Sequence, residues 1–245
     1  MSGHSTVKYE DANALNLPSG PAMDSSHLIP VLTMEEMDPS LAGGYRVIYD
    51  RETPLELRIQ DADNVPQQVG TLEAIRVKIL VMNDEGALRQ VRLELSTESD
   101  LFFLYAHTCD EKSFLIMQQH QKLMIEFPDY ANVLIRMLNN CIKEPQNHLA
   151  VYLMQADGRA RLDFIQNMEY KFVELLSLDF MRCSDDLIRQ HLAFRYNAMK
   201  ARLQILQTRL YEVNNIVKVK NPSLLLQLQK TSANPYGSKT RLTQQ

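Results

Sequence analysis

The chain has 245 residues, 45% of them hydrophobic and 23% charged, which is ordinary for a globular protein with one sizeable domain and an appendage. Its net charge of −4 argues against nucleic-acid binding through overall charge. No apolar run is long enough to predict a signal peptide or a membrane span. The three cysteines, Cys109, Cys141 and Cys183, are widely spaced and form no CxxC pair, so a reducing compartment is expected, with neither a disulfide framework nor a zinc site.

Residues 1–44 are predicted to form a disordered N-terminal arm. They are polar, contain four prolines and show no lasting periodicity. The fragment HLIPVLTMEEMDP, residues 27–39, is more apolar than the rest of the arm. It is interpreted either as a docking peptide or, more simply, as an apolar patch in a flexible tail.

Residues 45–183 are predicted to form a head domain of about seven strands. The alternation of apolar and polar residues is clearest in LEAIRVKILVM, where Ile75, Val77, Ile79 and Val81 share one face. Tight turns are expected at NDEG and at Asp157-Gly158. The segments expected to be strands are YRVIYD, LELRI, LEAIRVKILVM, LRQVRLELS, DLFFLYAHT, KLMIE, HLAVYLMQ, RLDFIQN and FVELLSLDFM.

Two helices interrupt this strand pattern. Asp110 is placed to cap the first, and Pro128 suits the first turn of the second. An apolar stripe including Leu134 and Leu138 marks the buried face of the second helix. The fold class is therefore mainly β with helices: a β-sandwich or barrel head with a helical insert.

A hairpin tip is expected at QNMEYKF, Gln166 to Phe172, between the last two strands. Met168 and Tyr170 are apolar residues at a turn that should face water. Two interpretations remain open from the residues alone. The Tyr170 ring folds back on its own head, or it binds another molecule.

Residues 184–220 are predicted to form one long helix, capped by Ser184 with two acidic residues in its first turn. Apolar residues recur alternately four and three positions apart, a heptad pattern typical of a parallel coiled coil. The alternative is an amphipathic helix lying on its own head. The seam consists of Leu192, Tyr196, Met199, Leu203, Leu206, Leu210, Val213 and Val217.

The flanks of this seam do not favour a homodimer. With Tyr196 at heptad position a, Arg195 at position g would face Lys200 at position e of the partner. A weak dimer is expected, which Arg195→Glu should strengthen by about 0.5 kcal/mol. Residues 221–245 are predicted to form a loose C-terminal tail.

No catalytic or cofactor motif is recognisable. The six histidines are scattered, and there is neither a Gly-rich phosphate loop nor a GxSxG motif. An enzyme is therefore not expected, nor is a cofactor, a metal or a small-molecule substrate.

The segment VRLELSTESDLFFLYAHTCDEKSFLIMQQHQKLMIEFPDYANVLIRMLNNC resembles the head of the spindle assembly abnormal protein 6 family, the centriolar cartwheel proteins. The resemblance lies in a strand ending in an acidic turn before FFLY, an acidic-capped helix and a helix opening on FP. LDFIQNMEYKFVELLSLDF is similar to the family's last hairpin, and HLAFRYNAMKARLQ to the start of its stalk.

The resemblance implies a β-sandwich-like barrel with a helical insert, followed by a parallel coiled-coil dimer. It also implies that heads pair through a hairpin that inserts an aromatic ring into an apolar pocket of a neighbouring head. That ring falls at Tyr170, where a Phe is more usual, with Met168 beside it. The long coil that forms cartwheel spokes is missing before Gln245. If Gln245 is the natural end, the chain resembles the shorter, coil-poor relatives, and otherwise a full cartwheel protein.

The predicted function is a non-enzymatic, self-assembling scaffold of the centriole, the basal body or a related flagellar or apical cytoskeleton. The expected location is the cytoplasm, on the cytoskeleton, at a centriole, basal body or apical complex. The expected partners are further copies of the chain and other proteins of these structures, with neither nucleic acid nor membrane. The alternative is an accessory scaffold of DNA double-strand-break end joining, which shares the head-plus-coil architecture.

Overall fold

The computed structural model describes residues 37–60 and 70–223. The predictions for residues 1–36, which include most of the apolar fragment at 27–39, and for the chain after Ser223 lie outside these residues.

Seven strands form a closed barrel in the order β1-β2-β3-β4-β7-β6-β5. This confirms a mainly β head and selects a barrel over a sandwich. Neighbouring strands are antiparallel except β1 and β5, which pair in parallel. The strands are β1 (Arg46–Gln60), β2 (Thr71–Asp84), β3 (Ala87–Ser96), β4 (Leu104–Asp110), β5 (His148–Gln155), β6 (Arg159–Met168) and β7 (Lys171–Arg182).

The barrel interior follows the alternation seen in the sequence. Ile75, Val77 and Ile79 of β2 are completely buried, as are Leu93 and Leu95 of β3. Burying each large aliphatic side chain contributes roughly 1.5–3 kcal/mol relative to exposure. The strands therefore hold each other in register through one continuous apolar core.

Three short segments differ from the prediction. YRVIYD and LELRI belong to the single strand β1, with a register shift between Val47 and Tyr49. KLMIE is a loop and not a strand, because its backbone bonds to the preceding helix. The Leu123 N–H donates to the Gln118 carbonyl at 3.0 Å, and the Gln118 side chain donates to the Ile125 carbonyl at 2.6 Å.

Strand β7 carries a second correction. Strict alternation along the expected strand FVELLSLDFM predicts Phe172 and Leu176 on one face, but Phe172 is 62% exposed whereas Leu176 is buried. The cause is an irregularity in the β6–β7 ladder, where Phe164 pairs with Leu176 but Ile165 pairs with Glu174. The extra residue on β7 is Leu175, so Phe172, which precedes it, lies on the opposite face from Leu176, which follows it.

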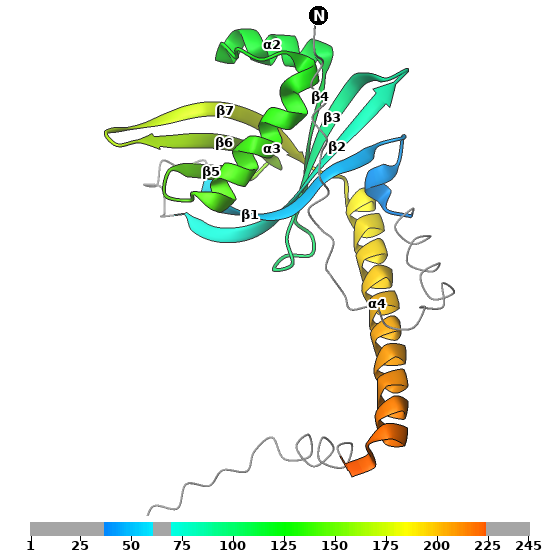
Figure 1. Ribbon diagram of the computed structural model, residues 1–245. Coiled ribbons are helices and arrows are strands. Elements are labelled where there is room, and N and C mark those ends of the chain that lie inside the picture. The colour runs from blue at the N-terminus through cyan, green and yellow to red at the C-terminus, as the bar shows by residue number, and fades with distance from the viewer. Residues whose placement is uncertain (1–36, 61–69, 224–245) are drawn as a thin grey trace, which may run out of the picture.

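Helices α2 (Glu111–Gln121) and α3 (Phe127–Lys143) form the insert between β4 and β5. The Asp110 side chain accepts a hydrogen bond from the Ser113 N–H at 2.8 Å, which confirms it as the cap of α2. Helix α3 lies against the barrel (Figure 1), and Tyr130, Leu134 and Leu138 on its inner face are completely buried.

The packed head begins before Tyr45. A short 3-10 helix, η2 (Pro39–Leu41), lies on the outside of the barrel. Asp38 forms an ion pair with Lys78 of β2 at 2.5 Å, and the Ser40 hydroxyl donates to Glu94 of β3 at 2.6 Å. The disordered arm predicted for residues 1–44 therefore does not extend over its last eight residues, because buried polar partners hold them.

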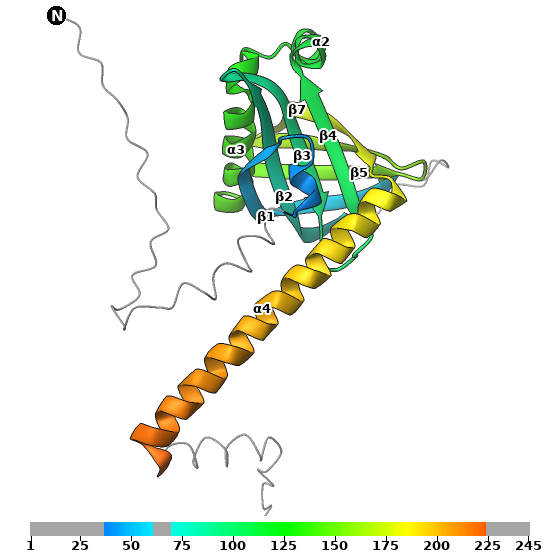
Figure 2. The same ribbon diagram turned by 90° about the vertical axis from the view of Figure 1, so that its right-hand side faces the viewer.

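Helix α4 (Asp185–Lys220) leaves the head as a single rod, seen from two sides in Figures 1 and 2. Its first turn is capped by the Ser184 side chain, which accepts from the Leu187 N–H. At about 1.5 Å per residue its 36 residues reach about 54 Å, and most of that length lies beyond the barrel.

Candidate self-association surfaces

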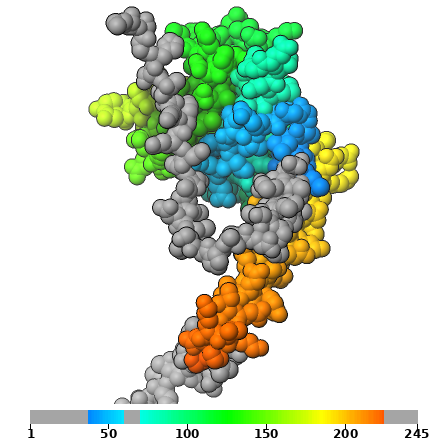
Figure 3. Space-filling view, turned by 45° about the vertical axis from the view of Figure 1, so that its right-hand side comes forward, coloured from blue at the N-terminus to red at the C-terminus, as the bar shows by residue number. Residues whose placement is uncertain are grey.

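The β6–β7 hairpin projects from the side of the head, as Figure 3 shows. Met168 pairs with Lys171, so Glu169 and Tyr170 form a two-residue turn. Glu169 has a φ of 48°, in the left-handed region that non-glycine residues seldom occupy. This turn directs the Tyr170 ring away from the head.

Tyr170 is 95% exposed and has the apolar neighbours Met168 and Phe172, both more than half exposed. The structure therefore does not support the interpretation in which the ring folds back on its own head. Three exposed apolar side chains close together at one hairpin tip are unusual on a surface that stays in water. They form a projecting apolar tip, suited to insertion into a partner.

A second exposed apolar group lies on the insert, on the flank of β7. Gln121 at the end of α2 exchanges two hydrogen bonds with the Ser177 backbone of β7, at 2.7 and 2.9 Å. These bonds place the loop after α2 beside the β6–β7 sheet. Met124 in that loop is 98% exposed, and Leu115 and Ile116 of α2 are about half exposed.

On this flank of the barrel, side chains supplement a short stretch of backbone pairing. Strands β4 and β7 share only two paired positions. Beyond them, the His107 ring contacts the Asp179 carbonyl through Nδ1 at 2.7 Å and the Tyr130 hydroxyl through Nε2 at 3.2 Å. Since a carbonyl only accepts, Nδ1 carries the proton and Nε2 accepts from Tyr130. Burial lowers the pKa of His107, so the ring is neutral near pH 7.

The third surface is the seam of α4. Six of its eight residues are more than half exposed: Tyr196, Met199, Leu203, Leu206, Leu210 and Val213. Leu192 and Val217 are partly covered. The helix does not lie on its own head along this stripe, which is what the alternative interpretation required. An apolar stripe at heptad spacing, left in water, is the surface on which coiled coils form.

A different face of α4 attaches the rod to the barrel. Ile188 and His191 are buried against the head, and the Nε2 atom of His191 has no hydrogen-bond partner among the described residues. The pKa of His191 is lowered overall, because the effect of burial exceeds the opposing effect of the nearby Glu94 carboxylate. Glu94, in turn, lies 2.9 Å from Arg92 and accepts a hydrogen bond from Ser40. A buried polar layer therefore joins η2, β3 and α4.

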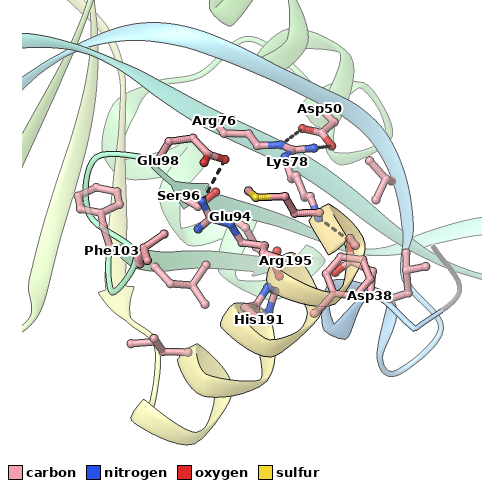
Figure 4. Close-up of a pocket in the computed structure, with 18 of the residues that line it drawn as sticks. Asp38, Asp50, Arg76, Lys78, Glu94, Ser96, Glu98, Phe103, His191 and Arg195 are labelled. Atoms are coloured by element: carbon pink, nitrogen blue, oxygen red, sulfur yellow. Dashed lines mark hydrogen bonds and ion pairs between the residues drawn. The ribbon is translucent and has the colours of Figure 1, made fainter. Parts of the chain in front are cut away.

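Beside this attachment is a cleft of about 640 Å³ between the barrel and α4 (Figure 4). Arg195 crosses it from α4 and donates to the Thr97 carbonyl at 3.1 Å. The same guanidinium forms an ion pair with Glu98, also at 3.1 Å. The heptad pattern predicts that Arg195 faces Lys200 of a partner helix, and within one chain the structure shows it held by its own head. No pattern in the sequence pointed to Glu98, because the pair is 97 residues apart.

Within residues 37–60 and 70–223, no group of three or more His, Cys, Asp or Glu side chains is arranged to hold a metal ion. None of the described helices combines the length and apolarity needed to cross a membrane. The surfaces described above are apolar at the hairpin tip and the seam, and ionic beside Arg195.

A barrel with a helical insert, an exposed aromatic tip and a rod with an unpaired heptad seam defines a class of protein: a head-and-stalk assembly module. The family model described as the centriolar protein SAS N-terminal domain matches residues 47–180, more than half of the chain. The chain therefore belongs to the SAS-6 family.

The similar curated proteins are spindle assembly abnormal protein 6 homologues. The zebrafish (Danio rerio) protein is 27% identical over 126 residues, which is 48% of this chain and 20% of that protein. The chicken (Gallus gallus) protein is 23% identical over 144 residues, 56% of this chain and 22% of that protein. The chain thus spans about a fifth of the length of the curated relatives it matches.

Solved structures agree in fold. An N-terminal fragment of Leishmania SAS-6 with part of its coiled coil has a TM-score of 0.60 at 18% identity, covering 74% of this chain and 98% of that one. A Drosophila melanogaster Sas-6 fragment, described as dimerised via the coiled-coil domain, has a TM-score of 0.61 at 14% identity, covering 80% of this chain and 93% of that one. At these identities the likeness establishes the fold alone.

Proposed function

We propose that this chain is a non-enzymatic structural scaffold that assembles with copies of itself in a centriole, a basal body or a related flagellar or apical cytoskeleton. Membership of the SAS-6 family supports the centriolar setting. The observation that carries self-assembly is the presence of two separate exposed apolar surfaces on one head-and-stalk chain: the hairpin tip at Tyr170 and the seam of α4.

In this proposal the seam forms a parallel two-stranded coiled coil. Burial of the seam between two helices removes eight apolar side chains per chain from water. The similarity to a Drosophila fragment that dimerises via its coiled coil is consistent with this use of α4.

The hairpin tip forms the second contact, between heads of different dimers. An isologous contact requires the projecting ring and the surface that receives it to lie on the same side of the head. The candidate receiving side chains are exposed Leu115, Ile116 and Met124 on the insert, since Gln121 anchors the end of α2 to Ser177 in the strand that follows the Tyr170 turn. Two different dimer contacts per chain extend the assembly beyond a dimer, into a ring or a filament.

Sedimentation over a concentration series tests the assembly. Tyr170→Glu should abolish head–head association while leaving the stalk dimer and the melting temperature nearly unchanged, since an exposed residue adds little to folding. Identical concentration dependence in wild type and Tyr170→Glu would remove the ring from the interface.

A fluorescent tag on the chain in its native cell tests the setting. Labelling of the flagellar base, a centriole or the cell apex supports the scaffold. Recruitment to DNA breaks would favour the end-joining alternative, for which salt-sensitive DNA binding is the confirming assay.

A further inference from the structure

The parallel coiled coil of the proposed function, on which this inference rests, has one like-charged pair on its flanks. In a parallel dimer each g residue faces the e residue five positions later on the partner helix. Arg202 and Arg209 then face uncharged Gln207 and Asn214 of the partner subunit. Arg195 alone faces a cation, Lys200 of the partner subunit.

The head places a carboxylate at that position. One Glu98 oxygen lies 3.1 Å from the Arg195 guanidinium, while the Glu98 side chain remains 66% exposed (Figure 4). The loop that presents Glu98 is shaped by its own bonds. The Ser99 N–H donates to the Thr97 hydroxyl at 3.2 Å, and the Phe102 N–H donates to the Asp100 carboxylate at 2.9 Å. Glu98 is therefore held next to α4 and still open to another cation.

This loop lies beside one edge of the seam of α4. Leu101 of the loop and Met199 of the seam line the same cleft. A partner helix packed on Met199 therefore runs beside the loop. Lys200 follows Met199 directly in the chain and is exposed on α4, so the two-fold symmetry of a dimer brings the partner's Lys200 to the flank occupied by Arg195 and Glu98.

We propose that Glu98 bridges Arg195 of its own stalk and Lys200 of the partner subunit. The head then takes part in the stalk dimer. With Glu98 between them, the repelling cations Arg195 and Lys200 of the partner subunit become members of a three-residue ion network. The network exists only in the parallel arrangement, since an antiparallel pair would not bring Arg195 and the partner's Lys200 together. The head thereby contributes to the orientation of the coiled coil.

Zero-length carbodiimide cross-linking of the full chain tests the contact, because this reagent joins a carboxylate and an amine that touch. Dimers mixed from heavy- and light-isotope chains should give a Glu98–Lys200 peptide that contains one heavy and one light half. Lys200→Arg is the matched control: it keeps the charge and the dimer, but the cross-link should disappear. A Glu98–Lys200 product only within single chains would overturn the proposal.

A double-mutant cycle measures the strength of the contact. Dissociation constants are compared for wild type, Glu98→Gln, Lys200→Gln and the double variant, all in the Tyr170→Glu background so that only stalk association is measured. The two changes should be coupled by about two- to tenfold, because exposed ion pairs are individually weak and this one occurs twice per dimer. The coupling should vanish at high salt.

Two further variants serve as controls for charge alone. Glu85→Gln in the β2–β3 turn and Lys218→Gln near the end of α4 remove the same charges away from the junction, and should leave the dissociation constant unchanged. If the chain dimerises but Glu98→Gln and Lys200→Gln show no coupling, the Glu98 bridge is overturned and the coiled coil is still supported. A wild-type chain that stays monomeric at every concentration would overturn the coiled coil itself, and the bridge with it.

Discussion

Single side chains on this head perform tasks that backbone pairing performs elsewhere. Where β4 leaves β7, His107 and Gln121 bond to the free backbone of Asp179 and Ser177. At the hairpin tip, by contrast, the side chain makes no contact with its own head. The strained turn at Glu169 leaves the Tyr170 ring without any intramolecular partner surface. The first kind of residue should control stability and the second kind association.

Tyr170 should act through its ring and not through its hydroxyl. Tyr170→Phe should preserve head–head association, since an apolar receiving surface needs only the ring. Tyr170→Ala should weaken it by about 2–4 kcal/mol, as expected when a single aromatic anchor dominates a small interface. Analytical ultracentrifugation of both variants decides this, and a Phe variant as weak as the Ala variant would assign the binding to the hydroxyl.

His107 should make the head sensitive to acid. Its pKa is lowered in the folded state, so the folded state disfavours the protonated ring. Stability is therefore complete above the ordinary pKa of about 6.5 and falls as the pH drops below it. His191, whose pKa is also lowered, acts in the same direction.

Thermal unfolding at pH 7.5 and 5.5 measures the effect. The wild-type melting temperature should be lower at pH 5.5 than at pH 7.5. Most carboxylates titrate below this pH range, so they contribute little to the difference. His107→Asn should melt lower at pH 7.5 but lose less on acidification, and combining it with His191→Asn should remove most of the dependence. A double variant with the full wild-type fall would contradict this assignment.

At the scale of elements, α4 carries two stripes with different tasks. One stripe, with Ile188 and His191, is buried against the barrel. The other, the heptad seam, is exposed from Tyr196 to Val213. Because the stripes are adjacent on one helix, the attachment to the head fixes the direction in which the seam faces.

The seam should fail when charge is placed in it. Leu203→Asp with Leu210→Asp would bury two unpaired carboxylates per chain between the helices, at a cost of several kcal/mol. Light scattering should show a monomer, and circular dichroism an intact β-rich head, since both residues lie outside the barrel. A double variant that remains dimeric, or a head that unfolds, would contradict the coiled coil.

At the scale of the whole molecule, the angle between head and stalk depends on contacts far apart in sequence. The arm at Asp38 and Ser40, β3 at Glu94 and α4 at His191 form one buried polar layer. Arg195 adds a second attachment to the loop after β3. We expect the direction of the rod to be determined by these contacts.

Arg195→Glu should loosen this joint. The sequence alone predicted a slightly stronger dimer, but the structure shows that the change would lose the Thr97 and Glu98 contacts and place two carboxylates together. In the monomeric Leu203→Asp/Leu210→Asp background, hydrogen exchange should rise in the first turns of α4. The β6–β7 hairpin serves as an internal reference and should not change. An unaltered α4 would contradict the attachment.

The sequence by itself determined the elements whose signal is local. Period-two burial in β2 and β3, the Asp110 cap and the Ser184 cap all depend on neighbours within a few residues, and the structure confirms them. The spacing of the heptad seam is equally local, and its use as a dimer interface stays a prediction. The position of Tyr170 at a hairpin tip was predictable in the same way, from two strands around a short polar turn.

Only the tertiary structure decided what depends on distant partners. The loop at KLMIE bonds to a helix and not to a strand, and one extra residue in β7 turns Phe172 outward. The hydrogen bond between His107 and Asp179 joins residues 72 positions apart, and the ion pair between Glu98 and Arg195 joins residues 97 positions apart. Such contacts leave no periodic trace in the chain, because each is specified by where the folded backbone brings two side chains together, and not by their spacing along it.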